Sequence, residues 1–286
     1  MNEKEYSNIS KLLPFANDNK SVDKAKYHAI SIRKKILSIS FAANTPHIGS
    51  SLSCVDIISA FFVCNKFDIN NQDEIFLLSK GHAAPALYSA LEEFGIISKE
   101  SLDKFGLSDS ILEEHPNHFI PGVPHPSGSL GHGLGFGAGF VLSGRTLSRE
   151  RRATIILSDG ECNEGTVWEA ALFAGAKSLV GLTAIIDQNG LQATGSIDET
   201  YGKAQIAQLF KASGWTTLTI NGHRHQEIIS ALKYAKTVKD SPVCIVAKTI
   251  KGRGVSFMEN NNNWHYRTLD QESFHAALDE IESIPK

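Results

Sequence analysis

Two polar stretches of the sequence carry side chains that could bind a metal ion. Asp159 follows the apolar run 153–157, and Asn189 follows the next apolar run, 182–187. Because the carboxyl ends of adjacent parallel strands open on one crevice, oxygens placed there converge. Carboxylate and amide oxygens suit Mg²⁺ or Ca²⁺, which leave coordination positions for water and phosphate oxygens. Gly160 would let the backbone approach a phosphate, and a helix starting near Thr166 would add a positive N-terminus.

The same residues also have a simpler explanation. Asp-Gly after a strand and Asn-Gly are common turn sequences, and either dipeptide alone favours a turn. The pair is more informative, because each member follows a predicted strand and a predicted helix lies between them. A metal site and a pair of turns are then about equally acceptable, and spacing alone does not decide between them.

The elements that would position these residues form an α/β pattern. Apolar residues spaced three and four apart from Ala29 to Ala43 predict a buried helix face. Ser53 to Asp56 resembles a capping box before the apolar run 55–63, and Gly95 fits the end of a helix that starts near His82. Short β-branched runs at 153–157, 182–187, 216–220 and 243–248 predict strands, and the stretches 166–178, 203–213 and 225–237 predict helices between them.

This alternation predicts a single α/β domain with a mainly parallel sheet flanked by helices. No linker divides the chain, so we expect one domain over residues 21–286. Residues 1–20 are polar and aperiodic, and we expect them to form a surface extension.

Composition limits the classes of partner. A formal charge of -3 and a pI of about 6.4 argue against bulk attraction to nucleic acid or to an anionic membrane. The longest apolar stretches fall far below the roughly 20 residues that span a bilayer. Residues 1–5 (MNEKE) start no basic segment followed by an apolar one, so we do not expect a secretory signal. The four cysteines form no Cys-x-x-Cys pair, so free thiols in a reducing compartment, the cytoplasm, are expected.

Several motifs spread over residues 25–270 resemble one enzyme family. They are residues 45–53 (TPHIGSSLS), 78–82 (LSKGH), 125–133 (HPSGSLGHG), 158–160 (SDG), 164–171 (EGTVWEAA) and 248–257 (KTIKGRGVSF). Together they resemble the N-terminal, diphosphate-binding half of transketolases, enzymes that move two-carbon ketol units with thiamine diphosphate. The family motif Gly-Asp-Gly, followed about thirty residues on by Asn, here corresponds to Ser158-Asp159-Gly160 and Asn189. The resemblance thus favours the metal site over the turns.

The resemblance implies roles for particular residues. Asp159, Asn189 and the backbone carbonyl of Leu191 would bind the metal ion, with Gly160 facing the diphosphate. The cofactor would also contact Gly128, Leu130, His82 and His265. Histidines that match family positions around the diphosphate and the reacting carbon are His47, His82, His115 and His265. Imidazole suits that place because it can donate to phosphate or alkoxide oxygens and transfer protons near neutral pH.

The other histidines are expected to be ordinary surface or loop residues (His118, His223, His225 and His275) or have no assigned role (His125). His132 stands where the family usually has Gln, and Ser158 where it has Gly. A hydroxymethyl group at position 158 would crowd the loop, or would be tolerated if the backbone angles there are ordinary.

Glu164 and Glu169 flank the start of a predicted helix, where acidic residues are favoured in any case. In the resembled enzymes, carboxylates at these positions link two cofactor sites across a subunit interface. The glycines that alternate from Gly131 to Gly139 follow no predicted strand, so a dinucleotide loop is a weak hypothesis, and close helix packing is favoured.

The resembled enzymes also carry a pyrimidine-binding domain and a C-terminal domain, for which 286 residues leave no room. We therefore expect the N-terminal subunit of a split transketolase that works on sugars or sugar phosphates. A C-terminal subunit with the pyrimidine-binding domain would complete an α2β2 assembly. The alternatives are a subunit of another thiamine diphosphate enzyme, such as a deoxyxylulose-phosphate synthase or a 2-oxoacid decarboxylase, and a non-catalytic binding or regulatory subunit.

Overall fold

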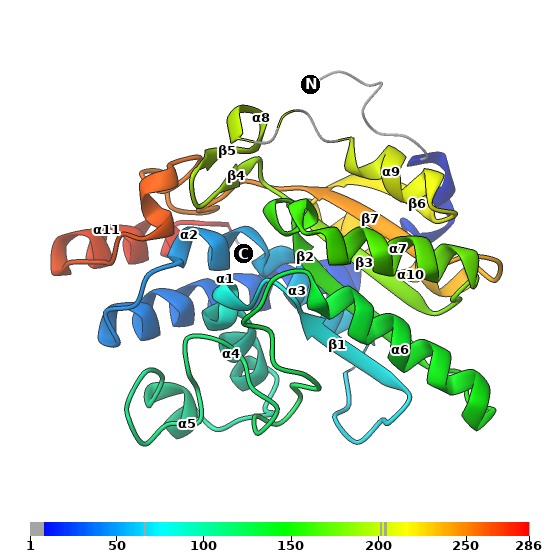
Figure 1. Ribbon diagram of the computed structural model, residues 1–286. Helices are drawn as coiled ribbons and strands as arrows, with labels where there is room; N and C mark the ends of the chain where they lie inside the picture. The colour runs from blue at the N-terminus through cyan, green and yellow to red at the C-terminus, as the bar shows by residue number, and fades with distance from the viewer. Residues whose placement is uncertain (1–8, 66, 201, 203–204, 286) are drawn as a thin grey trace.

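The computed structural model describes residues 9–65, 67–200, 202 and 205–285, which build a parallel sheet between two helical layers (Figure 1). Five parallel strands stand in the order β1-β2-β3-β7-β6. Their bounds are Glu74–Leu78 (β1), Arg152–Ser158 (β2), Leu182–Gln188 (β3), Thr216–Asn221 (β6) and Val243–Lys248 (β7). A small antiparallel pair, Leu191–Gln192 (β4) and Gly195–Ser196 (β5), follows β3.

The helices that cover the sheet are α1 (Asn19–Ala42), α2 (Ile48–Ser53), α3 (Val55–Asn65), α4 (Ala84–Glu93), α5 (Lys99–Asp103), α6 (His132–Leu147), α7 (Gly165–Ala176), α8 (Ile197–Thr200), α9 (Ile206–Ala212), α10 (His225–Thr237) and α11 (Gln271–Glu282). Four 3-10 helices complete the described elements: η2 (Ile9–Phe15), η3 (Gly81–Ala83), η4 (Gly160–Asn163) and η5 (Asn262–His265). No helix in the described part is long and apolar enough to cross a membrane.

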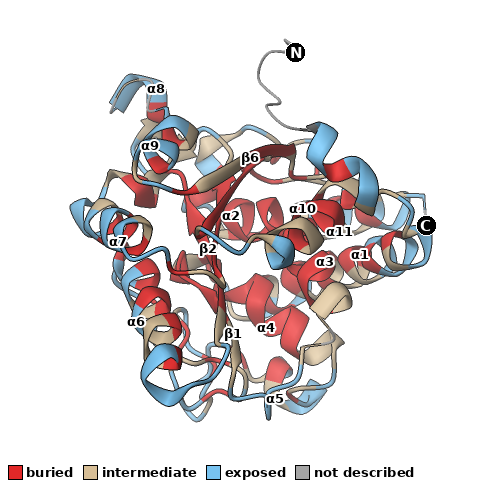
Figure 2. Ribbon diagram, turned by 90° about the vertical axis from the view of Figure 1, so that its right-hand side faces the viewer, coloured by how far each residue is buried: buried red, intermediate tan, exposed pale blue. Residues whose placement is uncertain are grey.

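Helices cover both faces of the sheet. Because successive strand residues point to opposite faces, each strand contributes to two cores. Ile156 and Ile185 belong to a core shared with α1, α3, α4 and α10. Ile155 and Ile186 belong to a second core shared with α6, α7 and α9. Figure 2 shows the buried strands between these helical layers. The predicted α/β fold with helices on both faces is therefore confirmed.

The four predicted strands and the helix from Ala29 to Ala43 are confirmed within a residue or two, apart from an earlier start of the helix at Asn19. The strand β1 was missed, because it has only five residues and polar stretches flank it. The helix expected over 203–213 begins at Ile206, and residues 203 and 204 lie outside the described residues.

Two expectations at the N-terminal side differ from the structure. Ser53 does not cap the helix at 55–63, because its hydroxyl donates to the Ser50 carbonyl and to the Asp187 carboxylate. Residues 9–15 of the expected surface extension form η2, which packs against α10 and buries Leu12. Residues 1–8 of the extension lie outside the described residues.

A buried ion pair ties the first helices to the last strands. Arg33 on α1 donates two hydrogen bonds to Asp56 on α3, at 2.9 and 2.7 Å. His223, which follows β6, donates from Nδ1 to the same carboxylate, while its Nε2 accepts from the Ile250 amide. Burial alone would raise the pKa of Asp56, but Arg33 and His223 hold it well below its usual range.

We expect Asp56→Ala to destabilise the chain by about 3–5 kcal/mol, because it leaves the buried Arg33 guanidinium without its partner. Urea denaturation measures this loss. The control is Asp103→Ala, whose exposed pair with Lys99 should contribute less than about 1 kcal/mol.

A carboxylate whose pKa is lower in the folded than in the unfolded state stabilises the folded chain above the unfolded pKa, and it loses that effect in acid. The difference between wild type and Asp56→Ala should therefore stay constant from about pH 7 to 5 and shrink below about pH 4. Equal stability of the two proteins at pH 7 would contradict this assignment.

Candidate functional site

Asp159 and Asn189 lie together at the carboxyl edge of the sheet. The register pairs Ser158 at the end of β2 with Asp187 near the end of β3, so the residues that follow are neighbours. The Asp159 carboxylate accepts hydrogen bonds from the Gly160 amide at 2.9 Å and the Gly190 amide at 2.6 Å. Asn189 Oδ1 accepts from the Leu191 amide at 3.0 Å. The Asp159 and Asn189 side chains thus both accept from the local backbone, and the Gly190 contact makes the two segments neighbours.

The Asp159 carboxylate is suited to a cation. Its residue is only 1% exposed, and no basic side chain of the described residues forms an ion pair with it. Burial raises its pKa to about 7, since the charged form lacks a compensating charge in contact. A divalent ion held by Asp159, the Asn189 amide oxygen and a backbone carbonyl would supply that charge. No cluster of three or more His, Cys, Asp or Glu in the described part could hold a metal. The oxygen donors of Asp159 and Asn189 are of the kind that suits a hard cation.

The serine at position 158 is accommodated by the loop. Its φ angle is not positive, so the backbone there needs no glycine. The Ser158 hydroxyl accepts a hydrogen bond at 3.1 Å from the Glu161 amide in the short helix η4, whose N-cap residue is Asp159. The extra hydroxymethyl group thus satisfies a backbone donor instead of crowding the site.

Glu161 holds in place the loop of residues 125–133, which we expected to contact the cofactor. This role of Glu161 was not predicted from the sequence. Its fully buried carboxylate accepts from the Ser79 hydroxyl, from the Gly131 amide at 2.9 Å and from the Ser158 amide at 3.2 Å. Burial raises its pKa, while these donors act in the opposite direction. One side chain therefore joins the ends of β1 and β2 to the start of α6.

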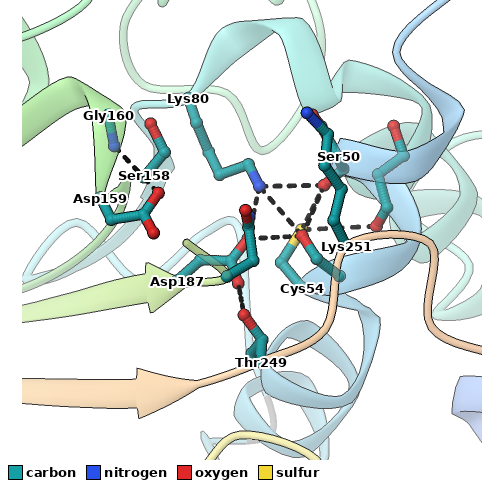
Figure 3. A network of polar contacts seen from close by, with 12 residues as sticks. Ser50, Cys54, Lys80, Ser158, Asp159, Gly160, Asp187, Thr249 and Lys251 are labelled. Atoms are coloured by element: carbon teal, nitrogen blue, oxygen red, sulfur yellow. Dashed lines mark hydrogen bonds and ion pairs between the residues drawn. The ribbon is translucent and has the colours of Figure 1, made fainter. Parts of the chain in front are cut away.

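Lys80 and Asp187 form a buried ion pair at the site (Figure 3). Both side chains are fully buried, and Lys80 Nζ lies 2.5 Å from Asp187 Oδ2. Lys80 also donates to the Ser50 carbonyl at 2.9 Å, and Thr249 donates to the other Asp187 oxygen. Burial opposes both charges, but the pair raises the pKa of Lys80 and lowers that of Asp187. Lys80 stands inside the quoted 78–82 motif, yet nothing in the sequence marked it as the partner of Asp187.

Three of the four expected histidines form one cluster. Ring centroids are 5.5 Å apart for His47 and His82, 5.1 Å for His47 and His265, and 5.7 Å for His82 and His265. The backbone of His47 is left-handed, with φ of 68°, and its amide donates to the His265 carbonyl. Such a conformation costs a non-glycine residue free energy, and it is often found at functional sites.

The environment keeps these histidines neutral. Burial is the main cause of the lowered pKa of all three. The Lys80 charge adds to this effect at His82, and the Lys251 charge at His265, whose pKa falls to about 3. Lys251 Nζ lies 2.8 Å from His265 Nδ1 and 2.8 Å from Asn262 Oδ1. Lys251 was not singled out from the sequence either.

The remaining expected residues surround this cluster. His115 is half-buried beside Gly128, where an added Cβ would meet its ring at 3.9 Å. Leu130 is half-buried in the loop before α6, Leu191 is half-buried in β4, and Gly160 begins η4. Glu164 and Glu169 are at the start of α7, and both are exposed.

The histidines without an assigned role differ from one another. His118, His132 and His275 are exposed, and His125 stacks on Phe136 with ring centroids 4.4 Å apart. His223 and His225 lie beside Asp56, so His223 is a satisfied structural residue. All four cysteines, each in the described part, are free thiols.

Comparison with known proteins agrees with this geometry. The family model described as "Transketolase, thiamine diphosphate binding domain" matches residues 27–281. The chain is 33% identical over 258 residues to one of the subunits of apulose-4-phosphate transketolase from Phocaeicola vulgatus, covering 87% of this chain and 90% of that protein. It is 34% identical over 263 residues to a 6-deoxy-6-sulfo-D-fructose transketolase subunit of a Clostridium species, covering 90% and 96% respectively.

Longer relatives match over less than half of their length. The crystal structure of transketolase from Campylobacter jejuni superimposes with a TM-score of 0.84 at 26% identity, covering 91% of this chain and 43% of that one. The family model matches most of the chain, and the two subunits above are more than 30% identical to it. The chain therefore belongs to the transketolase family and corresponds to its thiamine diphosphate binding domain.

Proposed function

We propose that this chain is the diphosphate-binding subunit of a split transketolase. In this proposal the assembled enzyme transfers a two-carbon ketol unit from a ketose to an aldose. Both substrates are sugars or sugar phosphates. The observation that supports this proposal most strongly is that Asp159 and Asn189 share one sheet edge with a cluster of neutral histidines. The related proteins of similar length, which are named as transketolase subunits, support the same conclusion.

The cofactor would be thiamine diphosphate with Mg²⁺, and Ca²⁺ would also suit the oxygen donors. Asp159, Asn189 and the Leu191 carbonyl would hold the metal ion, with Gly160 facing the diphosphate. The loop residues Gly128 and Leu130, together with His82 and His265, would contact the cofactor. When bound, thiamine diphosphate supplies the carbanion chemistry, while the protein binds and orients it.

The contact with Lys251 determines how His265 would present its proton. A lysine ammonium can only donate, so the 2.8 Å contact with Lys251 requires His265 Nδ1 to accept. The pKa of Lys251 is lowered to about 8, mainly by burial, so the amine is still charged near pH 7. Neutral His265 therefore carries its proton on Nε2, which can donate to a phosphate or alkoxide oxygen. His47, His82 and His115 would donate hydrogen bonds and transfer protons around the reacting carbon.

A partner subunit would complete the site. The family's pyrimidine-binding domain supplies the carboxylate that activates the cofactor, and we assign it to a separate C-terminal subunit in an α2β2 assembly. Glu164 is exposed, as a residue at a subunit interface would be before assembly, and Glu169 lies one turn further along α7. Leu172 and Phe173 are exposed on the same helix, at 59% and 42%, and provide apolar area for such contact. The free thiols favour the cytoplasm as the location.

We expect Asp159→Ala and Asn189→Ala to abolish metal-dependent binding of thiamine diphosphate by the assembled enzyme. Each change deletes one of the few protein oxygens around the metal ion, and water would replace it without preorganisation. Calorimetry with and without Mg²⁺ measures the effect, with the exposed Asp198→Ala as the matched control. Wild-type affinity in both variants would rule out the metal assignment.

We expect Lys251→Met to raise the pKa of His265 by about one to two units from its value of about 3. The change removes a neighbouring positive charge, so the protonated imidazole becomes less unfavourable. A histidine NMR titration of the full chain gives this pKa directly. Lys248→Met is the control, because it removes the same charge from a residue at the end of β7 that is not among the causes of the His265 shift. An unchanged His265 pKa, or an equal shift in the control, would disprove the proposed contact.

We expect the purified chain alone to leave proton–deuterium exchange at the thiazolium C2 at the rate of free cofactor. Activation in this family needs a carboxylate at the pyrimidine nitrogen, and Asp159 would lie at the diphosphate end. Addition of the C-terminal subunit should accelerate exchange by several orders of magnitude, which NMR measures without any sugar. Acceleration by this polypeptide alone, after mass spectrometry has excluded a contaminating partner, would refute the split enzyme.

A further inference from the structure

A basic hollow lies at the end of the sheet opposite the histidine cluster. It has a volume of about 370 Å³ and lies between the last turn of α6, the loop before β2 and the loop before β3. Its charged lining consists of Arg145, Arg149, Glu150, Arg151, Arg152 and Lys239. We call it the basic hollow.

The hollow is distinct from the cofactor site. The strand β2 begins in the hollow at Arg152 and ends at Ser158, next to Asp159, so seven residues separate the two by about 20 Å. The helix α6 also joins them, from the loop held by Glu161 to Leu147, over about 24 Å. Figure 1 shows α6 extending from the carboxyl edge of the sheet to this opposite end.

Positive charge is concentrated in the hollow although the chain as a whole is acidic. Among the described residues that line it, five are basic and one is acidic, whereas the formal charge of the chain is -3. Asp73 lies just outside and compensates part of this charge, through Arg149 at 2.7 Å and Arg151 at 3.6 Å. Glu150 is 4.0 Å from Arg152, and its side chain is 88% exposed. A positive excess therefore remains, which favours an anion.

The arginines are held in place by contacts that leave donors available. Arg145 Nη2 donates to the carbonyls of Lys177 and Ser178, at 2.6 and 2.8 Å. Arg151 Nη1 donates to the Ser143 hydroxyl at 2.6 Å, and its guanidinium lies 4.7 Å from the centre of the Phe140 ring. Each guanidinium carries five N–H donors, so these contacts leave others for a ligand. Side chains ordered beforehand lose less conformational entropy on binding.

The backbone beneath these side chains has an unusual conformation. Ser148 and Ser178 both line the hollow with positive φ angles, 53° and 44°, although neither is a glycine. A left-handed conformation is unfavourable for residues other than glycine. The carbonyl of Ser178 is also one of the two that accept from Arg145, so this conformation helps to position a guanidinium.

The chemistry of the lining selects a class of ligand. Guanidinium groups match phosphate oxygens with paired hydrogen bonds, and several of them around one hollow suit more than one phosphate. No aromatic side chain is among the described residues that line the hollow, so a nucleobase would find no ring to stack on. The volume fits a small ligand. We propose that the basic hollow binds a small polar molecule with two phosphate groups, such as a sugar bisphosphate.

The test uses the full chain in EDTA at low salt, with fructose 1,6-bisphosphate as the probe in a calorimetric titration. We expect one site, and Arg149→Glu or Lys239→Glu should each weaken binding by at least about tenfold, as loss of a charge-assisted hydrogen bond does. Lys99→Glu makes the same charge change at an exposed residue of α5 and should bind like wild type. Asp159→Ala should also bind like wild type, because the cofactor site is elsewhere. Circular dichroism establishes that the variants are folded.

Several results would overturn the proposal. They are absence of binding to the wild type at millimolar probe, wild-type binding by both hollow variants, and loss of binding in Asp159→Ala. Inorganic phosphate binding as tightly as the bisphosphate would contradict the requirement for two phosphates. A single-stranded oligonucleotide that binds more tightly than the bisphosphate, and is lost in Arg149→Glu, would show a nucleic-acid surface in its place.

Discussion

The ion pair between Lys80 and Asp187 is the constraint on which the site depends. It joins the residues that follow β1 to the end of β3, and it also holds α2 through Ser50 and the segment after β7 through Thr249. Two charges taken out of water in this way are stable only if their remaining hydrogen bonds are satisfied. The four segments are therefore fixed relative to one another, and the histidines at positions 47 and 82 are carried by two of them.

Periodicity predicted most of the fold. The four strands with long apolar runs were found because burial on both faces leaves a continuous apolar signal. The strand β1 gives no such signal, since it is short and begins at Glu74. The apparent cap at Ser53 failed for a different reason, because its hydroxyl is used in a tertiary contact with Asp187. Local patterns cannot show which of two partners a side chain will choose.

The site was predicted unevenly. Family motifs supplied Asp159, Asn189 and the histidines, and the structure brings these residues to one edge, although their roles remain proposals. The supporting residues Lys80, Glu161 and Lys251 were missed because their partners lie far away in sequence, as in the pair of Lys80 with Asp187. Long-range electrostatic pairing depends on the sheet order, which one sequence does not reveal. Glu164 and Glu169 had no local signal beyond their place at a helix start.

The serine at position 158 has a consequence for how the family motif is defined. The resembled enzymes have glycine there, but this loop needs neither a positive φ angle nor an absent side chain. The Ser158 hydroxyl instead accepts a hydrogen bond from the Glu161 amide in the first turn of η4. What the position requires is a backbone angle open to any residue and room for one small group. A motif that demands glycine would overlook chains that build the same loop, whereas one written in torsion angles and side-chain volume would include them.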